Sequence, residues 1–486
     1  MNAPDSYLAP PPALVVISGG PRAERCPSPT THSDPAWTLL RQALPDARRV
    51  LELGCAQGEL AQAYKHSHPN THWLGVDRHP HDLERAKQHM DEALCLDLTH
   101  ASIQTIESTF DLIIINRLEH LPQPARTLSE LGPLLAPGGA LIVLAENHAC
   151  LSAVAHLLEA DLSTGVAASA TDERSLNAAH PRHQSPSSIY KLLMDAGWMP
   201  NLVATLPDEP LNEQASAAAR LLASSLDIAP GNSEQVNRVR HLIIRAERCF
   251  DTDEPTSTAA LFDVVVPTTN ERQLRVNVEQ SPGLQEVQAR IVSYRLATSP
   301  AQALTESLQH VNSPWVLLCH QDVYFPKGFG QRLNALLSTI PDNDRASTLL
   351  GFIGMGVNRQ TQHCETAGFV IDRQHCASHP ESDSAVSIDE LALVVARDSI
   401  HRIDPHIGWH LWATDLCLTA ISEHRVFPRI ARLPLFHNSQ SGWTLPAAFM
   451  DSAEYLLQKH ASFSPIHTLC GVIDPGFIAQ HRSTQA

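Results

Sequence analysis

Residues 48–77 read RRVLELGCAQGELAQAYKHSHPNTHWLGVD, and this stretch decides the fold of the first half of the chain. An apolar run, Val50–Leu53, precedes a turn of small residues, a helical pattern and a second apolar run that ends at Asp77. This order is typical of a strand–helix–strand unit with parallel strands. Gly54 and Gly58 let the backbone approach a ligand closely, and Asp77 lies where an acidic side chain can hold a ribose diol. We therefore expect an α/β domain that binds a nucleoside.

The composition of the 486-residue chain is that of a globular protein too long for one ordinary core. Its formal charge of −17 argues against affinity for a nucleic-acid backbone or an anionic membrane surface. The ten cysteines contain no close pair of the kind that zinc sites or redox motifs use, so we expect reduced thiols and a cytoplasmic protein. No apolar run reaches the roughly 18 residues of a spanning helix, so any membrane-borne substrate would be met by peripheral contact.

The chain divides into four predicted segments. Residues 1–34 are rich in proline, with no basic leader before their short apolar patch, and we expect a disordered tail rather than a signal peptide. Residues 35–248 form the first domain, and 249–260 are a polar linker with proline and threonine. A new order of strand, polar turn and helix begins at residue 261, which predicts a second α/β domain over 261–486.

The segment ELGCAQG, Glu52–Gly58, resembles the acidic-x-Gly-x-Gly-x-Gly motif of class I S-adenosylmethionine-dependent methyltransferases, with Ala56 at the middle glycine. The segments LCLDLT, FDLIIINRLEHL, LGPLLAPGGALIVLAEN and IYKLLMDAGWMP follow in the family's order. The resemblance covers about residues 35–247 and implies a Rossmann-like domain that binds S-adenosylmethionine. The contacts it implies for this cofactor are Glu52, Gly54, Ala56, Gly58, Asp77, Asp97 and Asn116. The alternative is a glycine-rich turn that only packs tightly.

Glu119 and His120 follow the fourth apolar run of this domain and are candidate catalytic residues. Methyl transfer chiefly needs alignment of the nucleophile with the activated methyl group, but a hydroxyl acceptor profits from a base. An imidazole with an ordinary pKa near 6.5 suits that role at neutral pH. The alternative is that both side chains only cap the next helix.

The second domain contains the stretch SPWVLLCHQDVYFPKGF, in which the apolar run Trp315–Cys319 stops at His320, Gln321 and Asp322. A carboxylate at the end of a buried strand must be solvated, paired or bound to a metal. Further candidate positions follow apolar runs or precede them. They are Pro267, Asn270, Glu271, Asp389, Glu390, Asp415 and His437.

Taken in their order along the chain, this stretch and these positions resemble an inverting glycosyltransferase of the GT-A, family 2-like type. The Asp-x-Asp motif of that family ends a strand in mid-domain. A subgroup of such enzymes reads His-Gln-Asp there. The resemblance implies Mg²⁺ or Mn²⁺ on Asp322, His320 and His437, bridging the phosphates of a nucleotide-sugar. Imidazole ligands favour Mn²⁺. The nucleotide-sugar contacts it implies are Pro267, Asn270, Glu271, Asp389 and Glu390.

The same resemblance implies that Asp415, at the start of an amphipathic helix, is the general base for the acceptor hydroxyl. Two alternatives stay open. Asp322 would be a strand-end carboxylate bonded to backbone N–H groups, and Asp415 an ordinary helix N-cap. The segment LQEVQARIVSYRL shows no aspartate after its strand to hold a nucleobase, so the sequence leaves the nucleotide unassigned.

The sequence therefore predicts a fused enzyme that transfers methyl groups and sugars, in bacterial surface glycan synthesis. The expected partners are a nucleotide-sugar donor and a glycan or lipid-linked sugar acceptor, without nucleic acid. The alternative is that one domain is catalytic and the other a binding or scaffold module.

Overall fold

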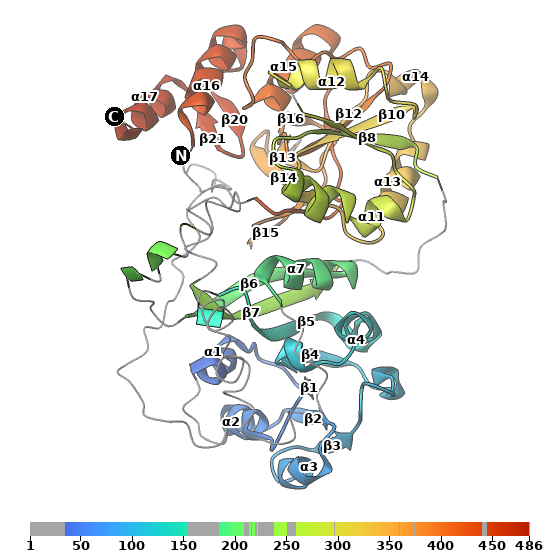
Figure 1. The fold of residues 1–486 in the computed structure, drawn as a ribbon, viewed down its shortest axis with the longest axis vertical. Coiled ribbons are helices and arrows are strands. Elements are labelled where there is room, and N and C mark those ends of the chain that lie inside the picture. The colour runs from blue at the N-terminus through green and yellow to red at the C-terminus, as the bar shows by residue number, and fades with distance from the viewer. Residues whose placement is uncertain are drawn as a thin grey trace. The chain divides into compact units, whose positions relative to one another are not determined.

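The chain forms two compact units in the computed structural model, divided between Thr252 and Asp253, a point inside residues 249–260. The residues described are 35–150, 152–153, 184–208, 238–249, 259–295, 297–358, 360–373, 375–439 and 445–485, with short pieces between 213 and 221. The predicted tail, 1–34, lies outside them. We call the units N-terminal and C-terminal and describe each by itself (Figure 1).

The N-terminal unit is built on a seven-stranded sheet with the order β3-β2-β1-β4-β5-β7-β6. The strands are β1 Arg49–Leu53, β2 His72–Asp77, β3 Glu92–Cys95, β4 Phe110–Asn116, β5 Leu135–Glu146, β6 Trp198–Pro207 and β7 Val239–Arg248. β1 to β5 pair in parallel, and β7 runs antiparallel to both its neighbours. The strand order reverses between β1 and β4, and ligands of open α/β sheets bind at the carboxyl ends of the strands at such a point.

Helices cover this sheet on both faces (Figure 1). They are α1 Pro35–Ala43, α2 Glu59–Ser67, α3 Pro80–Ala86, α4 Pro124–Leu131 and α7 Pro186–Asp195, with 3₁₀ turns η1 Ile103–Thr105, η2 Leu118–His120 and η3 Gly132–Leu134. Alternate strand residues, such as Leu112 and Ile114, pack with the buried side chains of α1, α2 and α3. The Rossmann-like α/β fold expected from Arg48–Asp77 is therefore present.

The C-terminal unit has a central six-stranded mixed sheet with the order β18-β12-β17-β10-β8-β9. Its strands are β8 Phe262–Pro267, β9 Ile291–Tyr294, β10 Trp315–Cys319, β12 Leu349–Gly351, β17 Ala392–Ala396 and β18 Arg429–Ile430. β10 pairs in parallel with β8 and antiparallel with β17. The end of β10 therefore lies beside the end of β8 and the beginning of β17.

A second sheet, in the order β11-β19-β14-β13-β16 with β15 on β14, adjoins the end of β10. Its strands are β11 Val323–Tyr324, β13 Ile353–Val357, β14 Cys364–Asp372, β15 His375–Ser378, β16 Ala385–Ile388 and β19 Leu435–His437, and β20 Ile466–Thr468 pairs with β21 Gly471–Ile473. The helical segments of this unit are α10 Glu271–Leu274, η4 Arg275–Glu279, α11 Pro282–Gln285, α12 Pro300–Ser307, α13 Phe329–Ser338, α14 Asp342–Arg345, α15 Trp412–His424, α16 Ala447–Lys459, η5 Ala461–Phe463 and α17 Pro475–Gln485.

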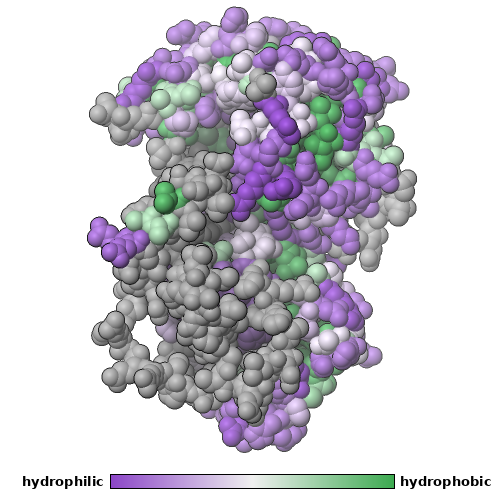
Figure 2. Space-filling view, in the orientation of Figure 1, coloured by the Kyte–Doolittle hydropathy of each residue, from purple (hydrophilic) through white to green (hydrophobic). Residues whose placement is uncertain are grey.

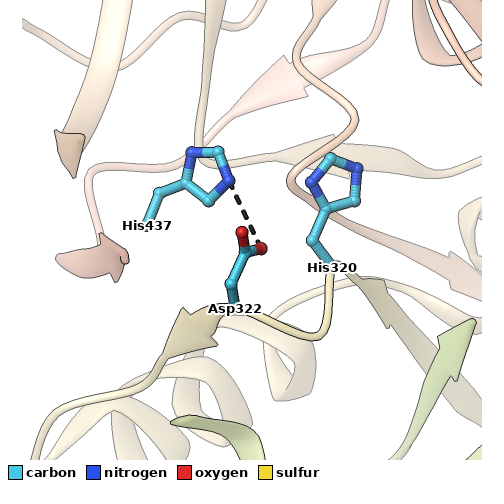
Figure 3. Close-up of side chains that lie close together, drawn as sticks. All are labelled: His320, Asp322 and His437. Carbon is cyan, nitrogen blue, oxygen red and sulfur yellow. Dashed lines mark ion pairs between the residues drawn. The ribbon is translucent and has the colours of Figure 1, made fainter. Parts of the chain in front are cut away.

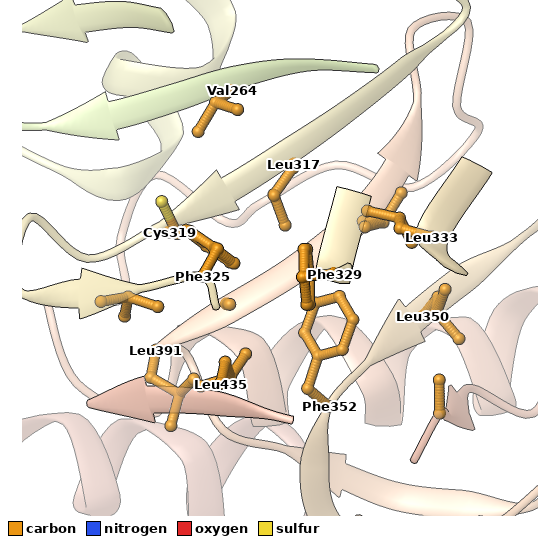
Figure 4. Close-up of a cluster of buried hydrophobic side chains, with 14 of the residues drawn as sticks. Val264, Leu317, Cys319, Phe325, Phe329, Leu333, Leu350, Phe352, Leu391 and Leu435 are labelled. Carbon is orange, nitrogen blue, oxygen red and sulfur yellow. The ribbon is translucent and has the colours of Figure 1, made fainter. Parts of the chain in front are cut away.

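The central sheet of the C-terminal unit is buried on both faces, which explains its uninterrupted apolar strands. Val264 and Leu317 point to a core with Phe325, Phe329 and Leu333, which Figure 4 shows. Their neighbours along the strands point to a second core, which includes residues of α15 and α16.

The face of the C-terminal unit drawn in Figure 2 is mostly hydrophilic, with small hydrophobic areas between polar ones. Large exposed hydrophobic side chains of this unit include Ile400, Trp409 and Phe427. Among the residues that the structure describes, no helix is long and apolar enough to cross a bilayer.

Candidate functional sites

The turn after β1 has the backbone conformation of a ligand-binding turn. Gly54, Ala56 and Gly58 have φ values of 78°, 44° and 87°, in the left-handed region that glycine adopts most easily. A Cβ at Gly54 would lie 3.0 Å from the carbonyl oxygen of Asn116, so the turn lies against the end of β4. The middle position is left-handed even though it is alanine, which explains why the motif has glycine there. Ala56 therefore carries backbone strain.

Asp77, at the end of β2, holds this turn in place. One carboxylate oxygen accepts a hydrogen bond from the Ala56 N–H at 3.0 Å, and the other accepts one from the His79 N–H at 3.0 Å. The side chain is 11% exposed. Asp77 therefore connects the two predicted cofactor segments, the turn after β1 and the end of β2.

Glu52, a predicted cofactor residue, lies beneath the turn rather than on its surface. Its side chain is buried and accepts a hydrogen bond from the Trp73 indole N–H at 3.1 Å. Burial raises the pKa of Glu52 to about 8. The structure therefore gives Glu52 a contact inside the core of the unit, between β1 and β2.

Asp97 and Asn116 lie at the carboxyl edge of the sheet. Asp97 is exposed two residues beyond β3, and its carboxylate accepts a hydrogen bond from the Thr99 N–H at 2.9 Å. Asn116 is the last residue of β4 and is half-buried. Both predicted cofactor positions are therefore on the edge where the strand order reverses.

Glu119 and His120 belong to η2, and neither caps the next helix, whose N-cap is Gln123. The capping alternative is therefore wrong. Glu119 is buried and accepts a hydrogen bond from the Glu146 N–H at 3.2 Å, which joins η2 to the end of β5. Desolvation and the nearby Arg117 lower the pKa of His120 to about 4, so the imidazole is neutral at neutral pH but a weaker base than the value near 6.5 expected from the sequence would imply.

In the C-terminal unit, His320, Asp322 and His437 converge after β10 (Figure 3). One ligand atom from each lies within 4.8 Å of the others, and all three side chains are half-buried. Strand pairing explains the approach, because His437 is the register partner of Val323 in β11. The His437 Nε2 atom lies 3.4 Å from the Asp322 carboxylate. We call these three residues the metal-site cluster.

Asp372 orients one member of this cluster. It is the register partner of His437 across β14 and β19, and its carboxylate lies 2.9 Å from His437 Nδ1. The other ring nitrogen therefore points to Asp322. A carboxylate behind a histidine in this way is the usual arrangement around metal-binding imidazoles.

The charges in the cluster are coupled. Burial lowers the pKa of His437, but the carboxylates of Asp322 and Asp372 outweigh it and raise the value well above that of an ordinary imidazole, so this ring gives up a proton when it binds a metal. Burial raises the pKa of Asp322, but the neighbouring His437 outweighs it and lowers the value to about 2. Burial lowers the pKa of His320 to about 4, so this ring is neutral and has a lone pair for a metal. Two imidazoles and one carboxylate suit Mn²⁺ better than Mg²⁺, which prefers oxygen ligands. The residues present therefore fit a divalent transition metal.

Gln321, between two members of the cluster, joins it to the turn after β8. Its side-chain oxygen accepts hydrogen bonds from the N–H groups of Thr269 and Asn270, both at 2.8 Å. Asn270 in turn caps α10 through hydrogen bonds from Arg272 and Gln273. This predicted nucleotide-side turn therefore lies beside the cluster. Two further predicted residues flank it: Pro267 ends β8 and Glu271 pairs with Arg295 at the surface.

Asp389 and Glu390 precede β17, directly beside the end of β10. The His320 N–H donates to the Leu391 carbonyl at 2.9 Å. Asp389 accepts a hydrogen bond from the Leu391 N–H, and Glu390 accepts one from the Leu411 N–H at 3.0 Å. Both predicted sugar-side carboxylates are therefore near the cluster.

Asp415 lies in the first turn of α15, but this helix is not amphipathic as expected. Its buried residues face all sides because α15 lies inside the second core: they are Trp412, Ala413, Thr414, Asp415, Leu416, Cys417, Leu418, Ala420 and Ile421. The N-cap is Leu411, so the N-cap alternative is also wrong. The Asp415 carboxylate is 1% exposed and contacts His460 Nε2 at 2.8 Å and Lys459 Nζ at 2.9 Å. The predicted base is therefore paired with Lys459 and His460.

The structure adds Gln321 and Asp372 to the candidate site. Gln321 lies between His320 and Asp322 in the sequence. Nothing in the sequence predicts that its side-chain oxygen accepts hydrogen bonds from Thr269 and Asn270, about fifty residues earlier. Asp372 ends an apolar strand, as Asp77 does, and that pattern was the available signal.

Comparison with known proteins agrees with the N-terminal fold and turn. Residues 50–139 match the family model described as a methyltransferase domain. The chain is 33% identical over 163 residues to a trans-aconitate 2-methyltransferase of Methylobacterium radiotolerans, which covers 33% of this chain and 62% of that protein. It is 23% identical over 175 residues to a ubiquinone biosynthesis O-methyltransferase of Psychrobacter arcticus, covering 34% and 65%. The chain thus carries a methyltransferase-type domain and spans less than two thirds of these relatives.

Among solved structures, the plantazolicin methyltransferase BpumL in complex with SAH is 15% identical and covers 44% of this chain and 82% of its own, with a TM-score of 0.29. The relatives named here are all methyltransferases.

Proposed function

We propose that the chain is a bifunctional transferase. Its N-terminal unit would transfer a methyl group from S-adenosylmethionine, and its C-terminal unit would transfer a sugar from a nucleotide-sugar with inversion. The observation that supports methyl transfer is the left-handed turn after β1, tied to Asp77, inside the segment that matches a methyltransferase domain. The expected cofactors are S-adenosylmethionine and Mn²⁺ or Mg²⁺.

In the N-terminal unit, the turn presents backbone to the cofactor and Asp77 holds its ribose. S-adenosylmethionine supplies the activated methyl group. The neutral His120 imidazole is exposed next to the end of β4 and is the group that accepts a proton from an acceptor hydroxyl. The ubiquinone-biosynthesis relative is an O-methyltransferase by name, which favours an oxygen acceptor.

Isothermal titration with S-adenosylmethionine tests this half. The wild-type chain binds the cofactor saturably, and Asp77→Ala weakens it roughly 10- to 100-fold, the value of a hydrogen bond to a charged group. Asp46→Ala, at a 94% exposed carboxylate of the same unit, is the matched control. Equal affinity in both variants would contradict the proposal.

In the C-terminal unit, the supporting observation is the metal-site cluster beside the turn Thr268–Asn270. A divalent cation on the cluster supplies charge stabilisation to a departing nucleoside diphosphate. Gln321 holds the turn Thr268–Asn270 against the cluster. The nucleoside end of a nucleoside diphosphate would then meet this turn, and its phosphates would meet the cluster, with both groups already in place. The acceptor we propose is a glycan or lipid-linked sugar of a bacterial surface, met in the cytoplasm.

A panel of nucleotide-sugars with Mn²⁺ tests this half. We expect metal-dependent hydrolysis or transfer from one donor class, abolished by EDTA and restored by Mn²⁺. If every donor stays intact while Mn²⁺ binds, the C-terminal unit is not a sugar transferase.

A second candidate is that the N-terminal unit binds S-adenosylmethionine without turnover and serves as a scaffold. The observation that favours it is alanine rather than glycine at the left-handed position 56. Methyl incorporation into a glycan, lost in Asp77→Ala, would remove this candidate. Saturable binding without incorporation would support it.

A further inference from the structure

Trp409 lies in the loop 404–411, directly before α15, and is 41% exposed to solvent. Two other large apolar residues of this loop, Ile407 and Leu411, are buried in the second core. An indole is a large apolar group, and a folded chain gains stability when it covers one. The loop therefore turns two apolar side chains inward and keeps its largest one in solvent.

The loop is fixed on α16, so Trp409 is held in a defined place. Asp404, at its beginning, accepts hydrogen bonds from two side chains of that helix. A Cβ at Gly408 would lie 3.0 Å from Ser452 Oγ, so the backbone before Trp409 lies directly against α16. The His410 ring, after Trp409, has its centre 5.9 Å from that of Phe449. The exposed indole is thus carried by a rigid segment.

The end of the loop lies beside the metal-site cluster. The Leu411 N–H donates to the Glu390 carboxyl at 3.0 Å. The next residue, Leu391, accepts a hydrogen bond from the His320 N–H at 2.9 Å. Trp409 is two residues before Leu411, a span of at most about 7 Å. An exposed aromatic side chain is therefore anchored close to the candidate site.

The polar groups beside this part of the loop suit a neutral sugar. Glu390 and the adjacent Asp389 provide carboxyl groups, which hydrogen-bond hydroxyls and do not attract anions. A sugar ring has an apolar face of C–H groups and an edge of hydroxyls. An indole face next to carboxyl groups offers a matching surface to both.

We propose that Trp409 is the platform on which a neutral sugar ring of the acceptor stacks. This inference rests on the function proposed for the C-terminal unit and names the residue that holds the acceptor there. The indole covers the C–H face of the ring, and the ring hydroxyls meet the carboxyl groups of Asp389 and Glu390. Because the loop is already fixed, binding orders little additional chain.

Saturation-transfer NMR on the full chain tests the binding directly, without turnover. The probes are the methyl glycosides of glucose, galactose, mannose and N-acetylglucosamine. We expect saturation of the C–H protons on one face of the best-bound ring, and a decrease of at least about fivefold in Trp409→Ala, with partial recovery in Trp409→Phe. Phe427→Ala removes another exposed aromatic side chain, 52% exposed, and should keep the wild-type signal.

Two NMR results would overturn the proposal. One is that none of the four glycosides receives saturation from the wild-type chain. The other is that Trp409→Ala keeps the wild-type signal, or that Phe427→Ala loses as much of it.

Activity separates this proposal from the function on which it rests. With Mn²⁺, the nucleotide-sugar that the wild type cleaves fastest and the best-bound methyl glycoside, the ratio of transfer to hydrolysis should fall about tenfold in Trp409→Ala. Equal losses of transfer and hydrolysis would make Trp409 a structural residue and overturn the proposal. A wild-type chain that cleaves no donor, yet binds a glycoside through Trp409, would remove the proposed sugar transfer and leave the sugar platform standing.

Discussion

The two units build their candidate sites from different parts of the polypeptide. In the N-terminal unit, the turn from Gly54 to Gly58 supplies backbone, and a single carboxylate, Asp77, fastens it. In the C-terminal unit, the site consists of side chains, and His320 and Asp322 meet His437 from more than a hundred residues further along. A backbone site depends on left-handed φ values, whereas a side-chain site depends on strand register. Substitutions should therefore damage the two sites in different ways.

The largest effect is expected at Asp322, because no backbone contact can replace a missing metal ligand. Asp322→Ala should lower metal-dependent cleavage of a nucleotide-sugar about 1,000-fold, since charge stabilisation of the leaving diphosphate is lost. Initial rates over a range of Mn²⁺ concentrations measure it. Asp383→Ala, at a 71% exposed carboxylate of the same unit, serves as the control. Equal rates in both variants would mean that the cluster holds no catalytic metal.

The second, smaller effect is expected at Asp372, which contacts His437 but does not belong to the metal-site cluster. Asp372→Asn should weaken Mn²⁺ binding about 10- to 100-fold, because the imidazole loses the carboxylate that orients it. Paramagnetic resonance of free Mn²⁺ during titration gives the affinity. Glu365→Gln, on the same strand β14 but exposed, should bind Mn²⁺ as the wild type does.

The contacts of Asp404, which precedes α15, with Lys459 and Tyr455 of α16 should affect stability at acid pH. Lys459 and the His406 N–H outweigh burial and lower the pKa of Asp404 from 3.8 to about 2. Because the folded-state pKa is depressed, this stabilisation is present above pH 3.8 and is lost as pH falls toward 2. The shift corresponds to about 2 kcal/mol of unfolding free energy.

Urea unfolding of Asp404→Asn and the wild type between pH 7 and pH 2 measures this contribution. The difference between the two should shrink as pH falls through that window. Asp451→Asn, at a 72% exposed carboxylate on α16, should show no such convergence. A pH-independent difference for Asp404→Asn would contradict the assigned pairing with Lys459.

The smallest effect belongs to the backbone site. Ala56→Gly should relieve the left-handed strain and stabilise the N-terminal unit by about 1 kcal/mol or less, because glycine also gains freedom in the unfolded chain. Hydrogen exchange in β1 measures it. Ala63→Gly, in the middle of α2, should instead destabilise by about 1 kcal/mol. Destabilisation in both variants would mean that the conformation at Ala56 carries no strain.

The same contrast explains what the sequence could predict. The turn and Asp77 lie within the 24 residues 54–77, so their spacing along the sequence predicts the fold of the first unit. The apolar runs before His320 and His437 indicated two strands ending in possible ligands. Their meeting depends on the pairing of β11 with β19, which residue spacing does not specify.

Other features could not be obtained from local pattern. Asp415 follows an apolar helix start, a pattern equally compatible with an exposed base and with a buried ion pair. The partners Lys459 and His460 lie about 45 residues later, in α16. Similarly, nothing next to Glu52 in the chain predicted that Trp73 would cover it. Burial of a charged group is a property of packing between elements rather than of any one segment.

Mn²⁺ binding to the full chain in the presence of a nucleoside diphosphate tests the central claim for the C-terminal unit most directly. We predict one tightly bound Mn²⁺ per chain, detected by paramagnetic resonance, and its loss in His437→Ala and Asp322→Ala alike. Absence of saturable binding in the wild type, or binding that both variants retain, would contradict the claim that His320, Asp322 and His437 form a metal centre.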